Sequence, residues 1–448
     1  MAWLSVRLSG DRAALGASVA RGALATLILR TSGMALAAAA AVILARHLGP
    51  GGYGVYSWAF AWVSALAVPA ALGADQLLVR ESALTLDQGG GTLRSLLRSA
   101  FIRVTVASLL TAGLLAGGFV LLGGHAPLRR SALFFALPIL PLSALASLAQ
   151  GSLLGLGRTP AAVAPGTIGR QGLFLVFVVV AVAVGTASPD RAVQAQLFAT
   201  VLSCVVVLLL LRRALAAVNS GGQDSGAVGG GNGMRGDWLR ASIPMGAATM
   251  FLVIDAQVGL LVLGSSGLSA DAGVYAVALQ CTAPFALLLS AGRLPLGGAI
   301  ARLTVSGERD RLQRGLMIAT RAVAGASALV AAILLVLPGL VLGLFGSHFS
   351  TGENTLRIVV VAQLINATCA YNGLVLIMGG LQQLAVRSAL GGLLLDGVLC
   401  LALVGPLGSS GAAVALLISV SARNIVNTWL VRSRLGIDPT LLGRAPSP

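Results

Sequence analysis

Seven ionisable residues fall near the middle of long apolar runs, where a charge is costly. They are Arg30, Asp75, Arg170, Asp255, Arg293, Asp396 and Arg423. A charged residue at the centre of a membrane helix costs about 2.5–3.5 kcal/mol, so such residues face a cavity or a partner. Arginine suits phosphate because its planar guanidinium donates two parallel hydrogen bonds and stays charged. We therefore predict that Arg30 and Arg293 line a cavity between the two halves of the molecule and bind a phosphate-bearing substrate, with Asp75 and Arg170 in the same site.

A second group suits a small cation. Asp255, Asp396 and Asn427 offer carboxylate and amide oxygens at membrane depth, and such hard ligands bind Na⁺ or protons. We predict that they hold a coupling cation, Na⁺ or H⁺, and expect no organic cofactor. The alternative for both groups is internal pairing, in which the aspartates only neutralise nearby arginines. The four cysteines lie within apolar runs and lack the spacing of a metal site.

The chain is too apolar for a soluble domain. Of its 448 residues, 57% are hydrophobic and 10% are charged, and its mean hydropathy is +0.93, whereas about a quarter of an average globular domain is charged. A membrane-spanning helix needs about 20 apolar residues in succession. Twelve such runs occur, at 23–45, 55–79, 99–122, 131–156, 161–185, 192–211, 241–264, 273–301, 315–345, 356–379, 384–405 and 411–431. The sequence therefore predicts an all-α polytopic membrane protein with about 12 transmembrane helices.

A glycine- and serine-rich stretch, NSGGQDSGAVGGGNG at 219–233, separates two sets of six runs. Gly54-Val55-Tyr56 in the first half recurs in the second half as Gly273-Val274-Tyr275, each time near the start of the second run. Such a repeat indicates internal duplication. Because each half has an even number of spans, we predict two six-helix lobes related by a pseudo-two-fold axis along the membrane normal. The predicted segments are 1–22 (N-terminal), 23–213 (N-lobe), 214–239 (linker), 240–432 (C-lobe) and 433–448 (tail).

The basic residues indicate orientation rather than nucleic-acid binding. The net charge is +16, and all 30 basic residues are arginine. Short arginine-rich loops mark the cytoplasmic side of a membrane. With the N-terminus inside, twenty arginines fall on the cytoplasmic side and five on the outer side, namely Arg46, Arg129, Arg130, Arg191 and Arg357. We therefore expect a cytoplasmic N-terminal segment, linker and tail, and no nucleic acid among the partners.

Glycines mark the places where the backbone turns or helices meet. RHLGPGGYGVY at 46–56 joins the first two runs. Its glycines permit a positive φ and close approach, and Pro50 ends the first helix. Tyr53 and Tyr56 suit the membrane interface, with the ring in the apolar zone and the hydroxyl in water. The spacing of Gly113 and Gly117 predicts close helix packing.

The segment LARHLGPGGYGVYSWAFAWVSALAVPAALGADQLLVRE at 44–81 resembles the first hairpin of bacterial polysaccharide-unit flippases. These belong to the multidrug/oligosaccharidyl-lipid/polysaccharide exporter (MOP) superfamily. The shared features are Arg46, Leu48-Gly49, Gly54-Val55-Tyr56 and Leu72-Gly73, and LGSSGLSADAGVYAVAL at 263–279 resembles the matching loop of the second half.

The resemblance implies a two-lobed alternating-access flippase in the bacterial cytoplasmic membrane. Its substrate would be an oligosaccharide linked to undecaprenyl pyrophosphate, and its partners would be membrane lipids, a polysaccharide polymerase and glycosyltransferases. In such flippases basic residues on the helices of Arg30 and Arg293 face the lumen, and relatives with a sodium site place it among the helices of Asp255 and Asp396.

Two other functions stay open. A cation-coupled drug antiporter of the same superfamily is one, although arginines in both halves favour an anionic substrate. A membrane glycan polymerase or ligase is the other. The outer loops are short and nearly uncharged, and a chain without lysine has no P-loop, so we expect that the protein is not an enzyme.

Overall fold

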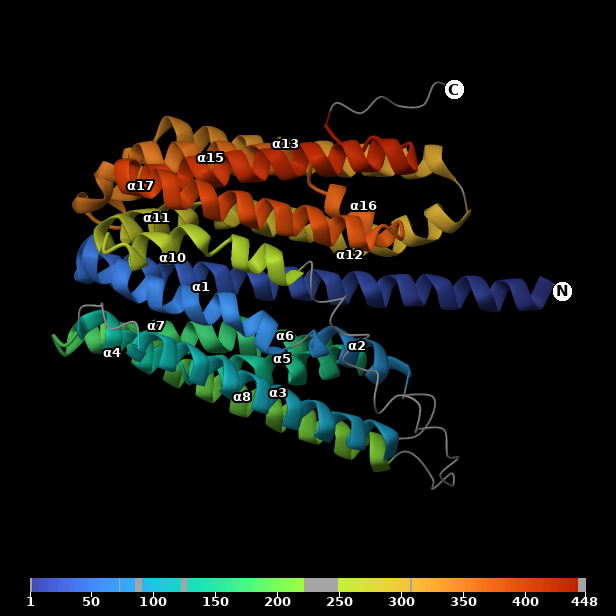
Figure 1. Cartoon of the computed structure of the whole chain (residues 1–448). Helices are drawn as coiled ribbons and strands as arrows, with labels where there is room; N and C mark the ends of the chain where they lie inside the picture. Colours follow the sequence, from blue (N-terminus) through green and yellow to red (C-terminus); the bar gives the residue numbers. More distant parts are fainter. Residues whose placement is uncertain are drawn as a thin grey trace.

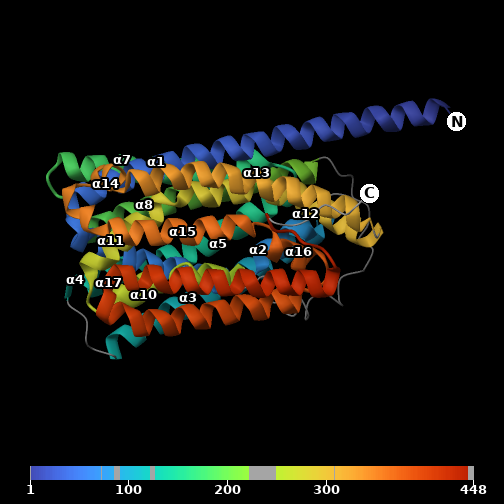
Figure 2. The same cartoon turned by 90° about the horizontal axis from the view of Figure 1, so that it is seen from above.

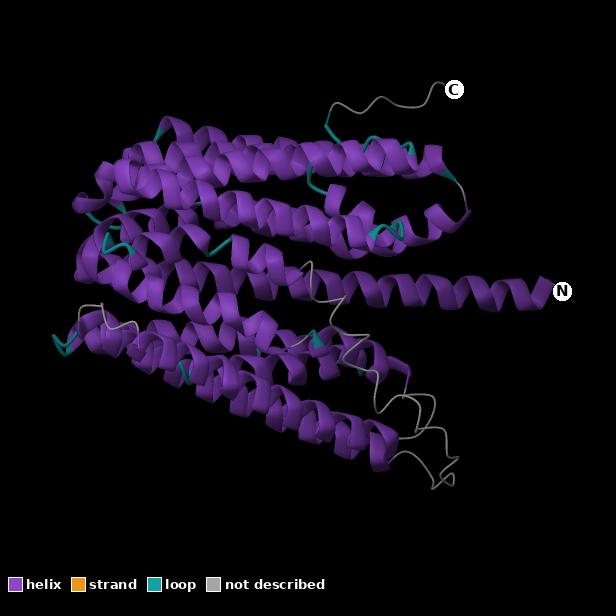
Figure 3. Cartoon of the chain, in the orientation of Figure 1, coloured by secondary structure: helices purple, strands orange, loops and turns teal. Residues whose placement is uncertain are grey.

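Two bundles of helices, one from each half of the chain, lie side by side in the computed structural model of the protein (Figure 1). The structure describes residues 2–71, 73–84, 91–121, 127–220, 249–306 and 308–441. Within these ranges the chain is helices joined by short loops, with no strand (Figure 3). The predicted all-α fold is confirmed. We call the bundles the N-lobe and the C-lobe; most of the predicted linker and residues 442–448 lie outside the described ranges.

The N-lobe is built from α1 (Ala2–Ala71), α2 (Ala74–Leu84), α3 (Gly91–Leu121), α4 (Pro127–Ala136), α5 (Ile139–Gly155), α6 (Thr159–Val163), the π-helix η1 (Pro165–Gly169), α7 (Arg170–Ala183) and α8 (Pro189–Ser220). The described C-lobe begins with a helix at 249–255. It continues with α10 (Val258–Ser265), α11 (Ser269–Cys281), α12 (Ala283–Ser306), α13 (Arg309–Val336), α14 (Pro338–Gly343), the 3₁₀ helix η2 (Ser347–Gly352), α15 (Glu353–Thr368), α16 (Asn372–Met378) and α17 (Gln382–Leu435).

Two of these elements are helical hairpins. The backbone of α1 leaves helical geometry at Gly49 (φ 64°, ψ 179°), and that of α17 does so at Gly408 (φ 54°, ψ −132°). Both conformations are open to glycine and strained for other residues. Ala25–Ala71 has 47 residues and Gln382–Leu435 has 54, which is about 70–80 Å of helix at 1.5 Å per residue. A bilayer core is about 30 Å thick, so each element crosses it twice.

Among the described residues, eight helices are long and apolar enough to cross a membrane, or nine if the bent pair Ser347–Thr368 and Asn372–Met378 is one span. This number is lower than the predicted twelve because each hairpin is counted once and the seventh run is described only from residue 249. Leu114, Leu121, Val336 and Leu401 are more than 70% exposed, as expected for side chains that face lipid. The chain is a multi-pass membrane protein.

The largest apolar cluster joins the two lobes at one end of the molecule. It contains Tyr53, Trp58, Leu263, Val274 and Phe349, together with many alanines. We call this the turn end because Gly49 lies there, and we call the opposite end the linker end. Three smaller clusters each lie within one lobe. The lobes therefore share a core at the turn end, and their helices diverge toward the linker end (Figure 1).

The amino-terminal part of α1 extends away from both lobes at the linker end (Figure 2). The predicted packing of Gly113 and Gly117 is wrong, because a methyl group at either position would meet nothing within 4 Å. Gly113 is exposed beside Leu114, and Gly117 is partly buried.

A short segment after α17 ties the C-lobe together at the linker end. Gln313 of α13 donates to the carbonyl of Asp438 at 2.8 Å and accepts from its N–H at 2.7 Å. The Thr320 hydroxyl donates to the Pro439 carbonyl at 2.9 Å, and Leu441 N–H donates to the Thr368 carbonyl at 3.0 Å. We call residues 436–441 the C-terminal strap. It bridges α13, α15 and α17.

Asp438→Asn is expected to loosen this strap. Burial disfavours the Asp438 carboxylate, but hydrogen bonds from Arg432 and Thr440 outweigh it, so the pKa of Asp438 lies below its usual value. The stabilisation is thus complete above about pH 4 and is lost as pH falls through the lowered pKa. Because Arg432 is 53% exposed, we expect a loss of about 1 kcal/mol at pH 7. Thermal unfolding in detergent would show the gap between variant and wild type closing at acid pH.

The matched control is Glu308→Gln. Glu308 pairs with Arg311 at 3.3 Å, but both side chains are exposed (48% and 74%), and such surface pairs contribute little. Equal stability of the Asp438 variant and wild type at pH 7 would contradict a structural role for the strap.

Candidate functional site

A cavity of about 320 Å³ lies inside the N-lobe, between α1, α5, α6, η1, α7 and α8. Two predicted substrate residues, Arg30 of α1 and Arg170 of α7, both line it. Its other polar lining residues are Ser143, Ser147, Gln150, Thr167, Thr200 and Ser203. No Asp or Glu whose side chain is described lines it. The cavity is therefore cationic.

The π-helix η1 positions Arg170 in the cavity wall. Pro165 has no N–H to continue an α-helix, and Gly169 N–H reaches back five residues to the Ala164 carbonyl at 2.9 Å. The Pro165 carbonyl accepts a hydrogen bond from the Ser203 hydroxyl of α8 at 2.7 Å. Such wide turns recur at functional sites, where they redirect one side chain. Here the turn ends one residue before Arg170.

Two close contacts fix the same wall. A methyl group at Gly33 of α1 would lie 3.1 Å from Thr167 Cβ and 3.2 Å from its carbonyl carbon. A methyl group at Gly166 would lie 2.7 Å from Nε2 of Gln150. Helix α1 and the Gln150 amide thus pack directly on the η1 backbone, and glycine at both positions makes this approach available.

The arginines supply charged donors to the cavity. Arg30 is exposed and Arg170 is partly buried. Nε of Arg170 is buried and has no hydrogen-bond partner among the described residues. A buried cation without an anion is costly. An anionic ligand in the cavity would supply the missing partner.

The hydroxyl groups supply acceptors. Ser147 donates to the Ala144 carbonyl at 2.8 Å, Thr167 to Val163 at 2.8 Å, and Thr200 to Gln196 at 2.7 Å. Each hydroxyl proton is thereby engaged, while the oxygen keeps lone pairs that can accept. Charged donors beside hydroxyl acceptors suit a ligand that carries both an anionic group and hydroxyl groups.

The predicted cation residues lie in the C-lobe. Asp255, in the helix at 249–255, forms an ion pair with Arg423 of α17, and the two side chains are 4% and 11% exposed. Asp396, on the other arm of the α17 hairpin, accepts from the Ser419 hydroxyl at 3.2 Å. Asn427 is 8% exposed, and its Oδ1 has no partner among the described residues. Asp396 lies within electrostatic range of Asp255 and Arg423.

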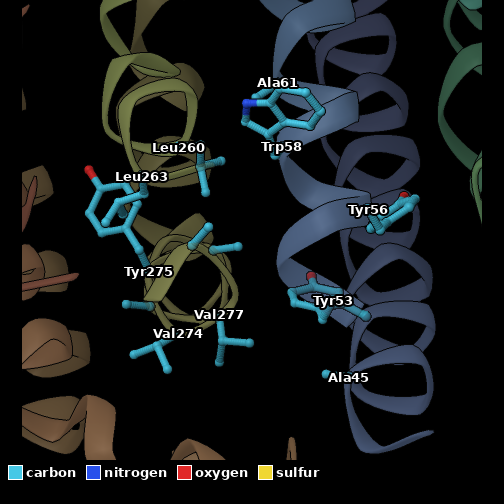
Figure 4. Close-up of a cluster of buried hydrophobic side chains, with 14 of the residues drawn as sticks. Ala45, Tyr53, Tyr56, Trp58, Ala61, Leu260, Leu263, Val274, Tyr275 and Val277 are labelled. Atoms are coloured by element: carbon cyan, nitrogen blue, oxygen red, sulfur yellow. The ribbon is translucent and has the colours of Figure 1, made fainter. Parts of the chain in front are cut away.

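The turn end is closed by the two halves of the sequence repeat. A methyl group at Gly54 of α1 would overlap the Ser269 carbonyl oxygen, and one at Gly273 of α11 would overlap the Pro50 carbonyl oxygen. Trp58 projects from α1 toward Leu260 and Leu263 of α10 (Figure 4). Its indole N–H donates to Ser265 at 3.4 Å. The repeated glycines thus form the crossing between lobes.

Tyr53 and Tyr56 were predicted to be interfacial anchors with hydroxyls in water, and this is wrong. They are 5% and 9% exposed. Tyr56 points away from α11 into the N-lobe (Figure 4), where its ring stacks on Phe174 of α7 with centroids 6.0 Å apart. The packing of one lobe on the other covers a turn that would be exposed in an isolated hairpin.

A family model described as "Polysaccharide biosynthesis protein" matches residues 19–290, more than half of the chain. The chain belongs to this polysaccharide biosynthesis protein family. The match covers the whole N-lobe cavity, both Gly-Val-Tyr motifs and Asp255. No curated protein matches the sequence.

Solved structures share the fold of this family member. An inward-facing multidrug resistance MATE transporter of the MOP superfamily has a TM-score of 0.64 at 14% identity, covering 92% of this chain and 98% of that one. An outward-facing one has a TM-score of 0.66 at 16% identity, covering 93% and 95%. The third structure is a MOP superfamily transporter from Pyrococcus furiosus, described by a reversed polarity of its binding pocket. Its TM-score is 0.65 at 15% identity, covering 93% of this chain and 95% of that one. The chain therefore has the fold of these MOP superfamily transporters.

The structure of this polysaccharide biosynthesis family member brings together some predicted residues and not others. Arg30 and Arg170 share one cavity. Asp75 lies in α2 and Arg293 in α12, but their side chains are outside the described part of the chain. Sequence reasoning missed the cavity's hydroxyl residues and Gly166, because serine, threonine and glycine are common in membrane helices of every kind.

Proposed function

We propose that the protein is a flippase that moves an undecaprenyl-pyrophosphate-linked oligosaccharide from the inner to the outer leaflet of the bacterial cytoplasmic membrane. The observation that carries this proposal is the cavity with two arginines and no described carboxylate. A pyrophosphate would neutralise the guanidinium groups, and the first sugar would donate to the hydroxyl oxygens beside them. The family description, polysaccharide biosynthesis, supports the same substrate class.

The proposed transport is by alternating access. With both termini in the cytoplasm, the turn end faces outward and the lobes are closed there. This arrangement corresponds to an inward-facing state, in which the substrate enters from the cytoplasmic side. Arg293 on α12 is the proposed contribution of the C-lobe, and Asp75 on α2 is the proposed partner that orients an arginine. Glycosyltransferases would supply the substrate, and a polymerase would consume it.

The second candidate function is efflux of cationic drugs. It is favoured by the likeness to multidrug resistance MATE transporters. Its difficulty is electrostatic, because a cationic drug in the N-lobe cavity would meet Arg30 and Arg170 without a described carboxylate to balance them. An anionic substrate has no such penalty.

The test is leaflet translocation of a lipid-pyrophosphate-linked oligosaccharide in proteoliposomes. Arg30→Gln and Arg170→Gln should each reduce the rate roughly tenfold or more, because a hydrogen bond to a charged group contributes about 1.5–3 kcal/mol. The matched control is Arg213→Gln, since Arg213 is exposed on α8 and does not line the cavity. Wild-type rates in both cavity variants would contradict the proposal. Export of a cationic dye without movement of the lipid would favour drug efflux.

A further inference from the structure

The C-lobe contains a cation of its own at the position predicted for a coupling ion. Arg423 reaches Asp255 from the second arm of the α17 hairpin, and both side chains are nearly buried. The Arg423 guanidinium stays charged at any accessible pH. Because it is covalently attached to the chain, it cannot leave the site as a free cation can. The acid that would bind a mobile cation is thus already paired.

The fold makes room for this arginine. Gly392 lies on the first arm of α17, and a methyl group there would sit 3.2 Å from Cδ and 3.4 Å from Nη1 of Arg423. Gly392 is one helical turn before Asp396, and both residues are buried on the same face of the helix. Any larger side chain at Gly392 would compete with Arg423 for the space beside the two aspartates.

The described cluster has two carboxylates, Asp255 and Asp396, and Arg423 already pairs with the first of them. Among the described residues, no group of three or more His, Cys, Asp or Glu side chains could hold a metal ion. Oδ1 of Asp396 accepts a hydrogen bond from Ser419. Asp255 Oδ1 and Asn427 Oδ1 are buried oxygens that have no partner among the described residues. Na⁺ commonly needs several oxygens, and here it would also meet the positive charge of Arg423.

We propose that Arg423 is a tethered counter-ion that replaces a dissociable Na⁺ in the C-lobe, so that this site binds no Na⁺ in the wild-type protein. It follows that the site could bind Na⁺ only if the Arg423 guanidinium were removed. Without the guanidinium, Asp255, Asp396 and Asn427 would present oxygens around an uncompensated negative charge, which is the environment that favours a small hard cation. This inference does not depend on which substrate the transporter carries.

The experiment measures Na⁺ binding to the purified full chain in detergent. Thermal unfolding is recorded in NaCl and in choline chloride at equal ionic strength, and ²²Na⁺ binding is measured on the same samples. We expect no Na⁺-specific shift in Tm and no saturable ²²Na⁺ binding in wild type. Arg423→Gln should have a lower Tm in choline chloride and should gain a saturable, Na⁺-specific rise in Tm with ²²Na⁺ binding.

Two further variants sharpen the result. Arg423→Lys keeps a tethered positive charge and should behave as wild type toward Na⁺. Arg423→Gln combined with Asp255→Asn should lose the gained Na⁺ response. Saturable Na⁺ binding in wild type that Asp255→Asn abolishes would overturn the proposal, and so would a folded Arg423→Gln protein that responds to Na⁺ no more than the double variant. If Arg423→Gln does not fold, the wild-type binding measurement alone still decides between a tethered and a dissociable cation.

Discussion

Gly54→Ala is expected to prevent the lobes from closing at the turn end and thereby to stop transport. The new methyl group would overlap the Ser269 carbonyl oxygen and lie 2.8 Å from the Gly273 nitrogen. Both are backbone atoms, so a lobe must move to relieve the overlap. Overpacking of this kind costs about 1–3 kcal/mol, and about 1.4 kcal/mol is tenfold in an equilibrium. We expect the closed population and the transport rate to fall roughly tenfold.

The fold itself should tolerate the change. Gly54 has helical geometry, and alanine is favoured over glycine inside a helix by roughly 0.5–1 kcal/mol. Gly273→Ala should have the same effect, because its methyl group would overlap the Pro50 carbonyl oxygen. Gly51→Ala is the matched control in the same turn, since nothing lies within 4 Å of its added methyl group.

The measurement pairs transport with a distance across the turn end. Spin labels at Arg191→Cys of the N-lobe and His348→Cys of the C-lobe occupy exposed positions once the four native cysteines are replaced. Gly54→Ala should lengthen the label-to-label distance relative to wild type and to Gly51→Ala. An unchanged distance together with normal transport would show that the glycine crossing does not control closure.

The repeated Gly-Val-Tyr motif is visible in the sequence, but the role of its glycines is not. Four glycines in the first turn were expected to allow positive φ, and Gly49 is the one that adopts it. Gly54 is helical and serves close approach instead, which depends on α11 arriving from the other half of the chain. Glycine allows both a positive φ and the close approach of another helix, so the composition of the turn does not show which of the two roles a given glycine has.

The same limit explains the two tyrosines and the cavity. Hydropathy predicts that Tyr53 and Tyr56 sit near a membrane surface, whereas burial by another lobe is a long-range property. Arg30 and Arg170 were recognised individually because charge at membrane depth is visible in one segment. Their meeting in one cavity depends on how α1, η1 and α7 cross, and no single segment encodes that crossing.

The turn end and the cavity are connected through α7. Tyr56 immediately follows the Gly54 crossing, and its ring stacks on Phe174, one helical turn after Arg170. Tyr56 also lies within electrostatic range of Arg170. Closure of the lobes at Gly54 therefore sets the position of Tyr56. Tyr56 in turn packs on α7, the helix that carries the cavity residue Arg170.

Gly33→Val is expected to disable the cavity without removing either arginine. Valine there would press on Cβ and backbone atoms of Thr167, so α1 would separate from η1. Arg30 lies one helical turn before Gly33 and would move with α1, away from Arg170. Losing one hydrogen bond to a charged group costs about 1.5–3 kcal/mol, so the substrate concentration for half-maximal transport should rise roughly tenfold or more.

A graded series separates geometry from charge. Gly33→Ala brings its methyl group to 3.1 Å from Thr167 Cβ and should have a smaller effect than valine. Gly172→Ala alters the neighbouring contact between α7 and α1, where the nearest atom, Leu36 Cδ1, is 3.8 Å away, and should transport normally. Membrane abundance and Tm are measured beside transport to detect misfolding. Normal half-saturation in a folded Gly33→Val protein would mean that the substrate does not require Arg30 and Arg170 at their present spacing, and the N-lobe cavity would then not be where its charged group binds.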